Sequence, residues 1–230
     1  MYEVVMRSTD AKRVVIIAGL LFWCTCLIAV RIERTGSGYY RFLIWNLSLA
    51  CIPLIATTAL RCARHLRLPL IVKAACLAFW LLFLPNAPYI LTDLLHLTAR
   101  SPAPAWYDLA LLLSCAGTGL LLGYLSLLDI HDIATQNFGR AIGWVLALSS
   151  LLLSGFAIYL GRFLRWNSWD VLIRPTILFD IADGLLHPSD HFHTLAITLI
   201  YGIILGFGYV SLRVLIASAP AVPNISRDQS

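Results

Sequence analysis

Charged residues are scarce in this chain of 230 residues. Only 13% of them are Asp, Glu, Lys or Arg, whereas 60% are hydrophobic. An average soluble domain has about 25% charged and roughly 45–50% apolar residues, so a water-soluble fold would lack the polar residues to cover its surface. The same composition excludes intrinsic disorder, collagen and a nucleic-acid-binding arm. The chain is therefore predicted to be an integral membrane protein with several spans.

Recognised metal and redox motifs are lacking as well. No H-E-x-x-H motif occurs, and the six cysteines form no C-x-x-C pair. Because all six lie within or at the edges of apolar runs, we interpret them as small packed hydrophobic side chains. They are Cys24, Cys26, Cys51, Cys62, Cys76 and Cys115.

Long apolar runs are what the sequence has in abundance. A run of about 20 residues is enough to cross the hydrocarbon core as a helix. Six runs predict spans at Val14–Val30, Phe42–Leu60, Leu70–Leu91, Tyr107–Leu128, Ala141–Gly161 and Phe192–Ala217. The connections are short, so we predict an all-α polytopic bundle of six spans that forms a single transmembrane domain over residues 1–217. Residues 218–230 are expected to be a disordered polar tail.

Basic residues indicate how the bundle is oriented. The first apolar run is followed by no A-x-A-like cleavage site, and we interpret it as an uncleaved first helix. With six spans, the termini share one face with the second and fourth loops. That face carries ten Lys and Arg residues, and the opposite face carries seven. Because basic residues favour the cytoplasmic side, we predict that both termini are cytoplasmic in a cell (inner or plasma) membrane. The formal net charge of +5 suits contact with anionic membrane lipids and requires no nucleic acid.

The third apolar run ends in FLPNAPYILTDLLHL, residues 83–97. Pro85 and Pro88 each remove a backbone donor, so carbonyl groups freed at membrane depth need other partners, and Asn86 is well placed to supply one. If the helix resumes after this break, spacings of three and four residues put a set of polar side chains on one stripe. This set comprises Asn86, Tyr89, Asp93, His96 and Arg100. The alternative is a proline-kinked helix whose polar residues merely meet the interface.

A second concentration of polar residues runs from Arg162 to His193. Proline suits a first helical turn and also stops a helix, so Pro175 and Pro188 predict an amphipathic helix over residues 175–187 that lies in the membrane interface. Its polar face carries Asp180, Asp183 and His187, either as part of a site or simply solvated.

These two concentrations lie in the third and fifth loops, which share one face of a six-span bundle. Carboxylate and imidazole groups together suit general acid–base chemistry or a divalent metal ion such as zinc, manganese or iron. The candidate catalytic residues are Asp93, His96, Asn86, Arg165 and Asp170. The candidate substrate-binding residues are Tyr89, Asn167 and Trp169, and the candidate metal ligands are Asp180, Asp183 and His187.

Two further features are predicted to be structural. Asp129, His131 and Asp132 follow the predicted fourth span and are expected at a helix end and in a solvated loop on the opposite face. The glycine pairs Gly119–Gly123 and Gly202–Gly206 have the spacing of small residues where helices pack closely. They indicate either packing inside the bundle or a dimer face.

The segment FLPNAPYILTDLLHL, together with WYD at 106–108 and RWNSWDVL at 165–172, resembles a known family. It is family 1361 among the domains of unknown function, a group of predicted bacterial multi-pass membrane proteins, and the resemblance covers about residues 40–215. The matching positions are Pro85, Asn86, Pro88, Tyr89, Thr92, Asp93, His96, Arg165, Asn167, Trp169 and Asp170. The resemblance implies a class of membrane protein and carries no activity with it.

Three functions stay open at this point. The first is a membrane-embedded enzyme that acts on a lipid-linked or anionic substrate at the outer interface, with Arg165 as an anion clamp. The second is a small-solute transporter or channel that uses the proline-broken third helix. The third is a structural or assembly subunit, which forms a homo-oligomer or joins another membrane protein.

Overall fold

The computed structural model describes residues 2–63, 69–97, 101–168, 170–173, 176 and 192–218, with the backbone alone at 2–10 and 171–172. Most of these residues are helical, and none of them forms a strand. Six of its helical stretches are long and apolar enough to cross a membrane. The prediction of an all-α multi-pass bundle is therefore confirmed.

The helices follow the predicted order. Helix α1 (Tyr2–Thr35), the short 3-10 turn η1 (Tyr39–Arg41) and α2 (Phe42–Cys62) come first. The third span consists of α3 (Leu70–Phe83), α4 (Asn86–Tyr89) and the 3-10 helix η3 (Ile90–His96). Then come α5 (Ala105–Phe138), α6 (Arg140–Phe163), α7 (Asp170–Ile173) and α9 (Phe192–Ser218). The predicted amphipathic helix, apart from Thr176, and residues 219–230 lie outside the described residues.

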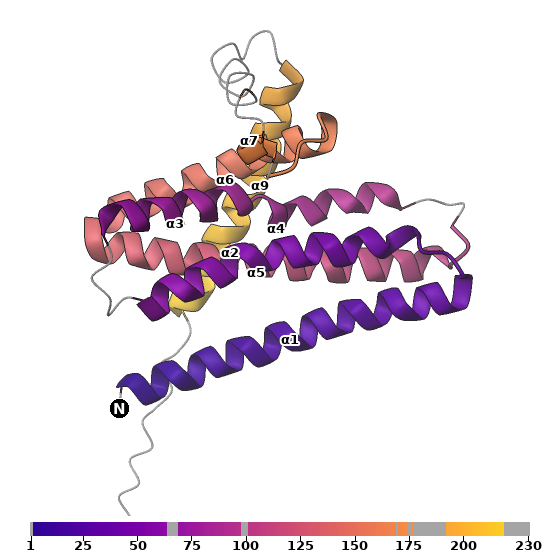
Figure 1. Cartoon of the computed structure of the whole chain (residues 1–230), viewed down its shortest axis with the longest axis horizontal. Coiled ribbons are helices and arrows are strands. Elements are labelled where there is room, and N and C mark those ends of the chain that lie inside the picture. Colours follow the sequence, from indigo (N-terminus) through magenta and orange to yellow (C-terminus); the bar gives the residue numbers. More distant parts are fainter. Residues whose placement is uncertain are drawn as a thin grey trace, which may run out of the picture.

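Helix α5 is the centre of the bundle. It packs against α1, α2, α4, η3 and α6, and it is the most buried of the six spans. Figure 1 shows α1 along one side of the bundle and α9 crossing the other helices obliquely. One buried apolar cluster joins α5 to α1, α2 and the broken third span, and a second joins α5 to α3, α6 and α9. The elements that carry the polar residues of the third span are thus fixed directly on α5.

Glycine permits the closest of these approaches. A Cβ atom at Gly119 would lie 2.7 Å from the carbonyl oxygen of Ala87, and one at Gly123 would lie 2.9 Å from the Ala87 Cβ. On the other side of the bundle, a Cβ at Gly202 would lie 2.8 Å from Leu152 of α6. These three glycines therefore pack inside the bundle, whereas Gly206 has no neighbour within 4 Å.

Helix α5 continues ten residues beyond the predicted end of the fourth span. It ends at Gly139, whose φ of +92° belongs to the left-handed region that glycine tolerates, and α6 begins at the next residue. The expectation of a loop at Asp129, His131 and Asp132 is therefore wrong, although the Asp132 side chain is exposed as expected. Asp129 and His131 are buried within α5, because distant helices supply their polar partners.

Candidate functional site

The third span breaks where its two prolines remove backbone donors. The Ala87 amide bonds to the Leu84 carbonyl at 3.1 Å, in place of the α-helical acceptor at Phe83. The Phe83 carbonyl instead accepts a hydrogen bond from Asn86 Nδ2 at 3.0 Å, so the Asn86 side chain replaces the missing backbone donor. The helix then continues as the seven-residue 3-10 segment η3. A 3-10 helix has 3.0 residues per turn, which places the side chains of Asp93 and His96 directly above one another.

Asp93 and His96 meet an arginine from α6. Arg162 Nη1 donates to His96 Nε2 at 3.1 Å and lies 3.6 Å from Asp93 Oδ1. The other carboxylate oxygen, Asp93 Oδ2, accepts a hydrogen bond from Asn46 Nδ2 of α2 at 2.8 Å. Because arginine can only donate, Nε2 of His96 acts as the acceptor and the ring proton lies on Nδ1. Three separate spans therefore fix one acid, one base and one cation in contact.

Two tyrosines before α2 hold His96 from the opposite side. The hydroxyl oxygen of Tyr39 lies 3.3 Å from His96 Nδ1 and accepts a hydrogen bond from it, and the Tyr40 hydroxyl donates to the His96 carbonyl oxygen at 3.1 Å. The ring of Tyr40 is buried beneath the guanidinium of Arg31, which is 4.4 Å from the ring centroid. Arg31 in turn forms a buried ion pair with Asp108, with Nε 2.6 Å from Oδ1. A continuous set of contacts thus joins α1 and α5 to the end of η3.

The segment after α6 adds a second arginine. The backbone amide of Trp166 donates a hydrogen bond to the Leu160 carbonyl at 3.2 Å, and Arg165, just before it, adopts the left-handed conformation in which helices commonly end. Glycine is usual at this position, but Arg165 adopts a φ of +58° with an exposed side chain. Further along, the Asp170 carboxylate accepts a hydrogen bond from the backbone amide of Asn167 at 2.7 Å. Ser168 Oγ accepts one from Asn86 Nδ2 at 2.9 Å. The segment is thereby attached to the break in the third span.

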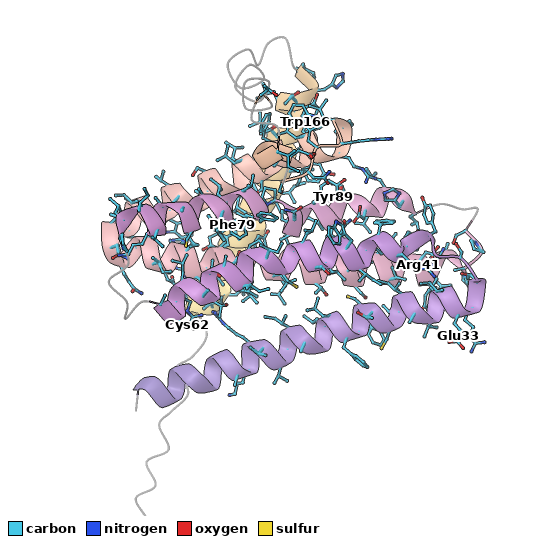
Figure 2. All side chains as sticks on the ribbon, viewed as in Figure 1. Glu33, Arg41, Cys62, Phe79, Tyr89 and Trp166 are labelled. Carbon is cyan, nitrogen blue, oxygen red and sulfur yellow. The ribbon has the colours of Figure 1, made fainter. Side chains whose placement is uncertain are left out.

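These side chains surround a cavity of about 630 Å³ between α2, the third span and α6. Figure 2 shows Tyr89 of the third span and Trp166, both of which line it, on the same side of the bundle. The polar wall comprises Asn46, Asn86, Tyr89, Asp93, His96, Arg162, Arg165, Asn167 and Ser168. The rest of the wall comprises Phe42, Trp45, Leu49, Ala78, Leu81, Leu82, Pro85, Leu153, Phe156, Ala157, Leu160, Gly161 and Trp166. The cavity is therefore amphipathic, with charge at one end and hydrocarbon at the other.

The structure brings most of the candidate residues together. The cavity wall includes the catalytic candidates Asn86, Asp93, His96 and Arg165, and the binding candidates Tyr89 and Asn167. Asp170 lies outside the wall and holds the Asn167 amide. Trp169, Asp180, Asp183 and His187 lie outside the described residues, so their proposed roles stay predictions.

Sequence reasoning missed Asn46 and Arg162 as members of this site. Asn46 is the one side-chain amide in the predicted second span, and a polar group of this kind inside a span commonly forms a hydrogen bond to another helix. Arg162 was named only as the first residue of the second polar concentration, although it lies in the last turn of α6 and its side chain can reach the third span.

The described residues contain no group of three or more His, Cys, Asp or Glu side chains that could hold a metal ion. Both ring nitrogens of His96 already have protein partners, Arg162 and Tyr39. A divalent metal therefore stays a prediction that depends on Asp180, Asp183 and His187.

A comparison with known protein families gives one match. The model of the family described as "Protein of unknown function (DUF1361)" matches residues 45–208, a range that includes the three segments 83–97, 106–108 and 165–172 and nearly all of the cavity wall. No curated protein and no solved structure matches the chain. The chain belongs to the DUF1361 family, and it is a multi-pass membrane protein.

Proposed function

We propose that this DUF1361 protein is a membrane-embedded enzyme that binds an amphipathic, anionic substrate in the cavity and carries out acid–base chemistry on its anionic group. The single observation that supports this proposal is the division of one cavity into a charged end and an apolar end. Ligand sites are commonly cavities of about 300–1,000 Å³ with apolar walls and a few convergent polar groups. This cavity, at about 630 Å³, is of that kind.

The charged end favours an anion. Its wall contains two arginines, Arg162 and Arg165, and one carboxylate, Asp93, so one positive charge is in excess. Arginine is suited to carboxylate and phosphate groups because its planar guanidinium can donate two parallel hydrogen bonds. Asn167 lines the same end, and because its Nδ2 makes only one long contact, 3.4 Å to Asp170, it can supply an uncharged donor.

His96 is the acid–base group of the proposal. Its Nε2 accepts a hydrogen bond from Arg162. When an anion in the cavity draws that guanidinium to itself, Nε2 loses its donor and is available to take a proton from the substrate or from water. Asp93, whose Oδ1 lies 4.0 Å from Nε2, then stabilises the imidazolium that forms. Tyr39 keeps the ring oriented through Nδ1.

The proposal is tested by binding of short-chain amphiphiles to the detergent-purified protein. We expect dihexanoyl phosphatidic acid to bind and dihexanoyl phosphatidylcholine to bind more weakly. Because a hydrogen bond to a charged group contributes about 1.5–3 kcal/mol, Arg165→Gln and Arg162→Gln should each weaken phosphatidic acid binding by about 10-fold to 100-fold.

Arg41→Gln is the matched control. Arg41 is an exposed arginine at the same end of the bundle, and the cavity wall does not include it. Figure 2 shows it beside Glu33 at that end, opposite Cys62. If Arg41→Gln weakens binding as much as Arg165→Gln does, the amphiphile binds to a basic surface and the proposed site is wrong.

A further inference from the structure

We infer that the substrate of this site is a membrane lipid with an anionic headgroup, which enters sideways between α2 and α6 while its chain stays in the bilayer. This inference rests on the proposed function and adds the class of substrate and its route. It follows from the shape of the apolar end and from which helices leave that end open.

The apolar end extends deep into the bilayer from the charged end. Along α6, Leu153 lines the cavity nine residues before Arg162. At 1.5 Å per residue, these two side chains are separated by about 13 Å along the helix axis. Ala78 and Leu81 of α3 also line the cavity, on the part of the third span that precedes its break. A water-soluble anion would leave this apolar length in contact with water, whereas a lipid chain fills it.

The side between α2 and α6 is where the cavity meets the membrane. Helix α2 packs on α3, α4 and α5, and α6 packs on α4, α5 and α9, but contact between α2 and α6 themselves is marginal at most. Trp45 of α2 and Leu153 of α6 both belong to the cavity wall, yet they are 59% and 42% exposed. Both residues belong to membrane spans, so the medium outside the bundle beside them is the hydrocarbon of the bilayer. The opening is therefore a lateral one.

The charged end lies at the depth of lipid headgroups. Arg162 is in the last turn of α6, and His96 is the last residue of η3. A lipid whose chain lies between Trp45 and Leu153 thus presents its headgroup to the two arginines. Because bilayer hydrocarbon is as apolar as the cavity wall, movement of the chain between them changes the free energy little. Selection of the lipid then depends on its headgroup charge.

The experiment uses the full-length protein in nanodiscs that contain dioleoyl phosphatidic acid in a phosphatidylcholine background. Native mass spectrometry counts the phosphatidic acid molecules that stay bound to the protein after it is released from the nanodisc. Ala157→Phe narrows the apolar end from α6, and Ala78→Phe narrows it from the exposed face of α3. We expect each to reduce retained phosphatidic acid at least 10-fold. Val145→Phe is the control, because Val145 is an exposed residue of α6 outside the cavity wall, and it should retain the lipid.

Two results would overturn the inference while leaving the proposed function intact. In the first, Arg165→Gln loses phosphatidic acid but Ala157→Phe and Ala78→Phe both keep it. In the second, glycerol 3-phosphate, a headgroup without chains, binds to the detergent-purified protein as tightly as dioleoyl phosphatidic acid. By contrast, unchanged lipid binding by Arg165→Gln and Arg162→Gln overturns the proposed function itself. The Ala78→Phe protein keeps the test decisive if Ala157→Phe does not fold, because Ala78 is exposed.

Discussion

At the scale of single residues, charges inside the spans are neutralised by partners from other helices. Asp129 accepts hydrogen bonds from Arg13 of α1 and Arg61 of α2, each at 3.0 Å. Arg31 and Asp108 are 1% and 0% exposed and form a two-point ion pair. An unpaired charge in an apolar medium is costly, so each of these contacts also fixes the relative position of two helices.

Removal of one member of the buried pair should be far more damaging than removal of an exposed one. Asp108→Asn leaves the Arg31 guanidinium buried without its counter-charge, and we expect a loss of about 3–5 kcal/mol in the free energy of unfolding. Asp132 and Arg213 form a partly exposed pair at 2.8 Å, so Asp132→Asn should cost at most about 1 kcal/mol. Denaturant unfolding in detergent compares the two variants. Equal losses would contradict the assignment of Arg31–Asp108 as the buried link between α1 and α5.

Arg165 is expected to lower the free energy of unfolding through its backbone conformation and to strengthen phosphatidic acid binding through its charge. Its φ of +58° is unfavourable for any residue with a Cβ by about 1–2 kcal/mol. Arg165→Gly should therefore raise the free energy of unfolding by about 0.5–1 kcal/mol, since the greater freedom of glycine in the unfolded chain offsets part of the gain. The same variant should lose phosphatidic acid binding. Arg165→Ala is the control, because it loses the charge but keeps the strained backbone. A stability gain in Arg165→Ala equal to that in Arg165→Gly would show that backbone strain is not the cause.

At the scale of whole elements, the third span shows what the sequence can predict and what it cannot. Two prolines three residues apart predict the break, and the spacing of Asn86, Tyr89, Asp93 and His96 predicts that they share one side. The 3-10 form of η3 is not predictable in this way, because spacings of three and four residues fit an α-helix equally well. The continuation of α5 beyond the predicted end of the fourth span was also missed, because it depends on contacts with distant residues. Asp129 and His131 are polar enough to suggest a loop. They are buried in the helix because Arg13, Arg61 and Tyr209, which are distant in the chain, supply their polar partners.

The contact between α4 and α5 can be tested with two glycines on one helix. A Cβ at Gly119 would lie 2.7 Å from the backbone oxygen of Ala87, which cannot move without displacing α4. We expect Gly119→Ala to lower the free energy of unfolding by about 1–3 kcal/mol. Gly117 is exposed with no neighbour within 4 Å, so Gly117→Ala should raise the free energy of unfolding by about 0.5–1 kcal/mol through better helix propensity.

Ligand binding by Gly119→Ala and Gly117→Ala provides a second test of the contact between α4 and α5. Because α4 carries Asn86 and leads directly into η3, a displaced α4 moves Asp93 and His96 away from Arg162. Gly119→Ala should therefore weaken phosphatidic acid binding, whereas Gly117→Ala should not. Unchanged stability and binding in Gly119→Ala would mean that the close approach of α4 to α5 does not hold the site together.

At the scale of the whole molecule, the charged contacts mark two levels along α5. Asp108 and Asp129 are 21 residues apart in one continuous helix, a rise of about 31 Å. This matches the thickness of the hydrocarbon core, which is about 30 Å. The Arg31–Asp108 pair reaches His96 through Tyr40, so the charged end of the cavity belongs to the Asp108 level. The bundle thus has a site at one headgroup level and the Arg13–Asp129–Arg61 contact at the other.

The basic residues predict which level faces the cytoplasm. The face with the termini carries ten Lys and Arg residues, and the face with the cavity carries seven. By the positive-inside rule, the cavity should open on the extracytoplasmic side. Green fluorescent protein fused after Ser230 should then fluoresce, and alkaline phosphatase fused there should be inactive. Fusions after Ser37, in the connection between α1 and η1, should give the reverse result and serve as the internal control. An active phosphatase after Ser230 would place the cavity at the cytoplasmic leaflet, and its lipid would then have to come from that leaflet.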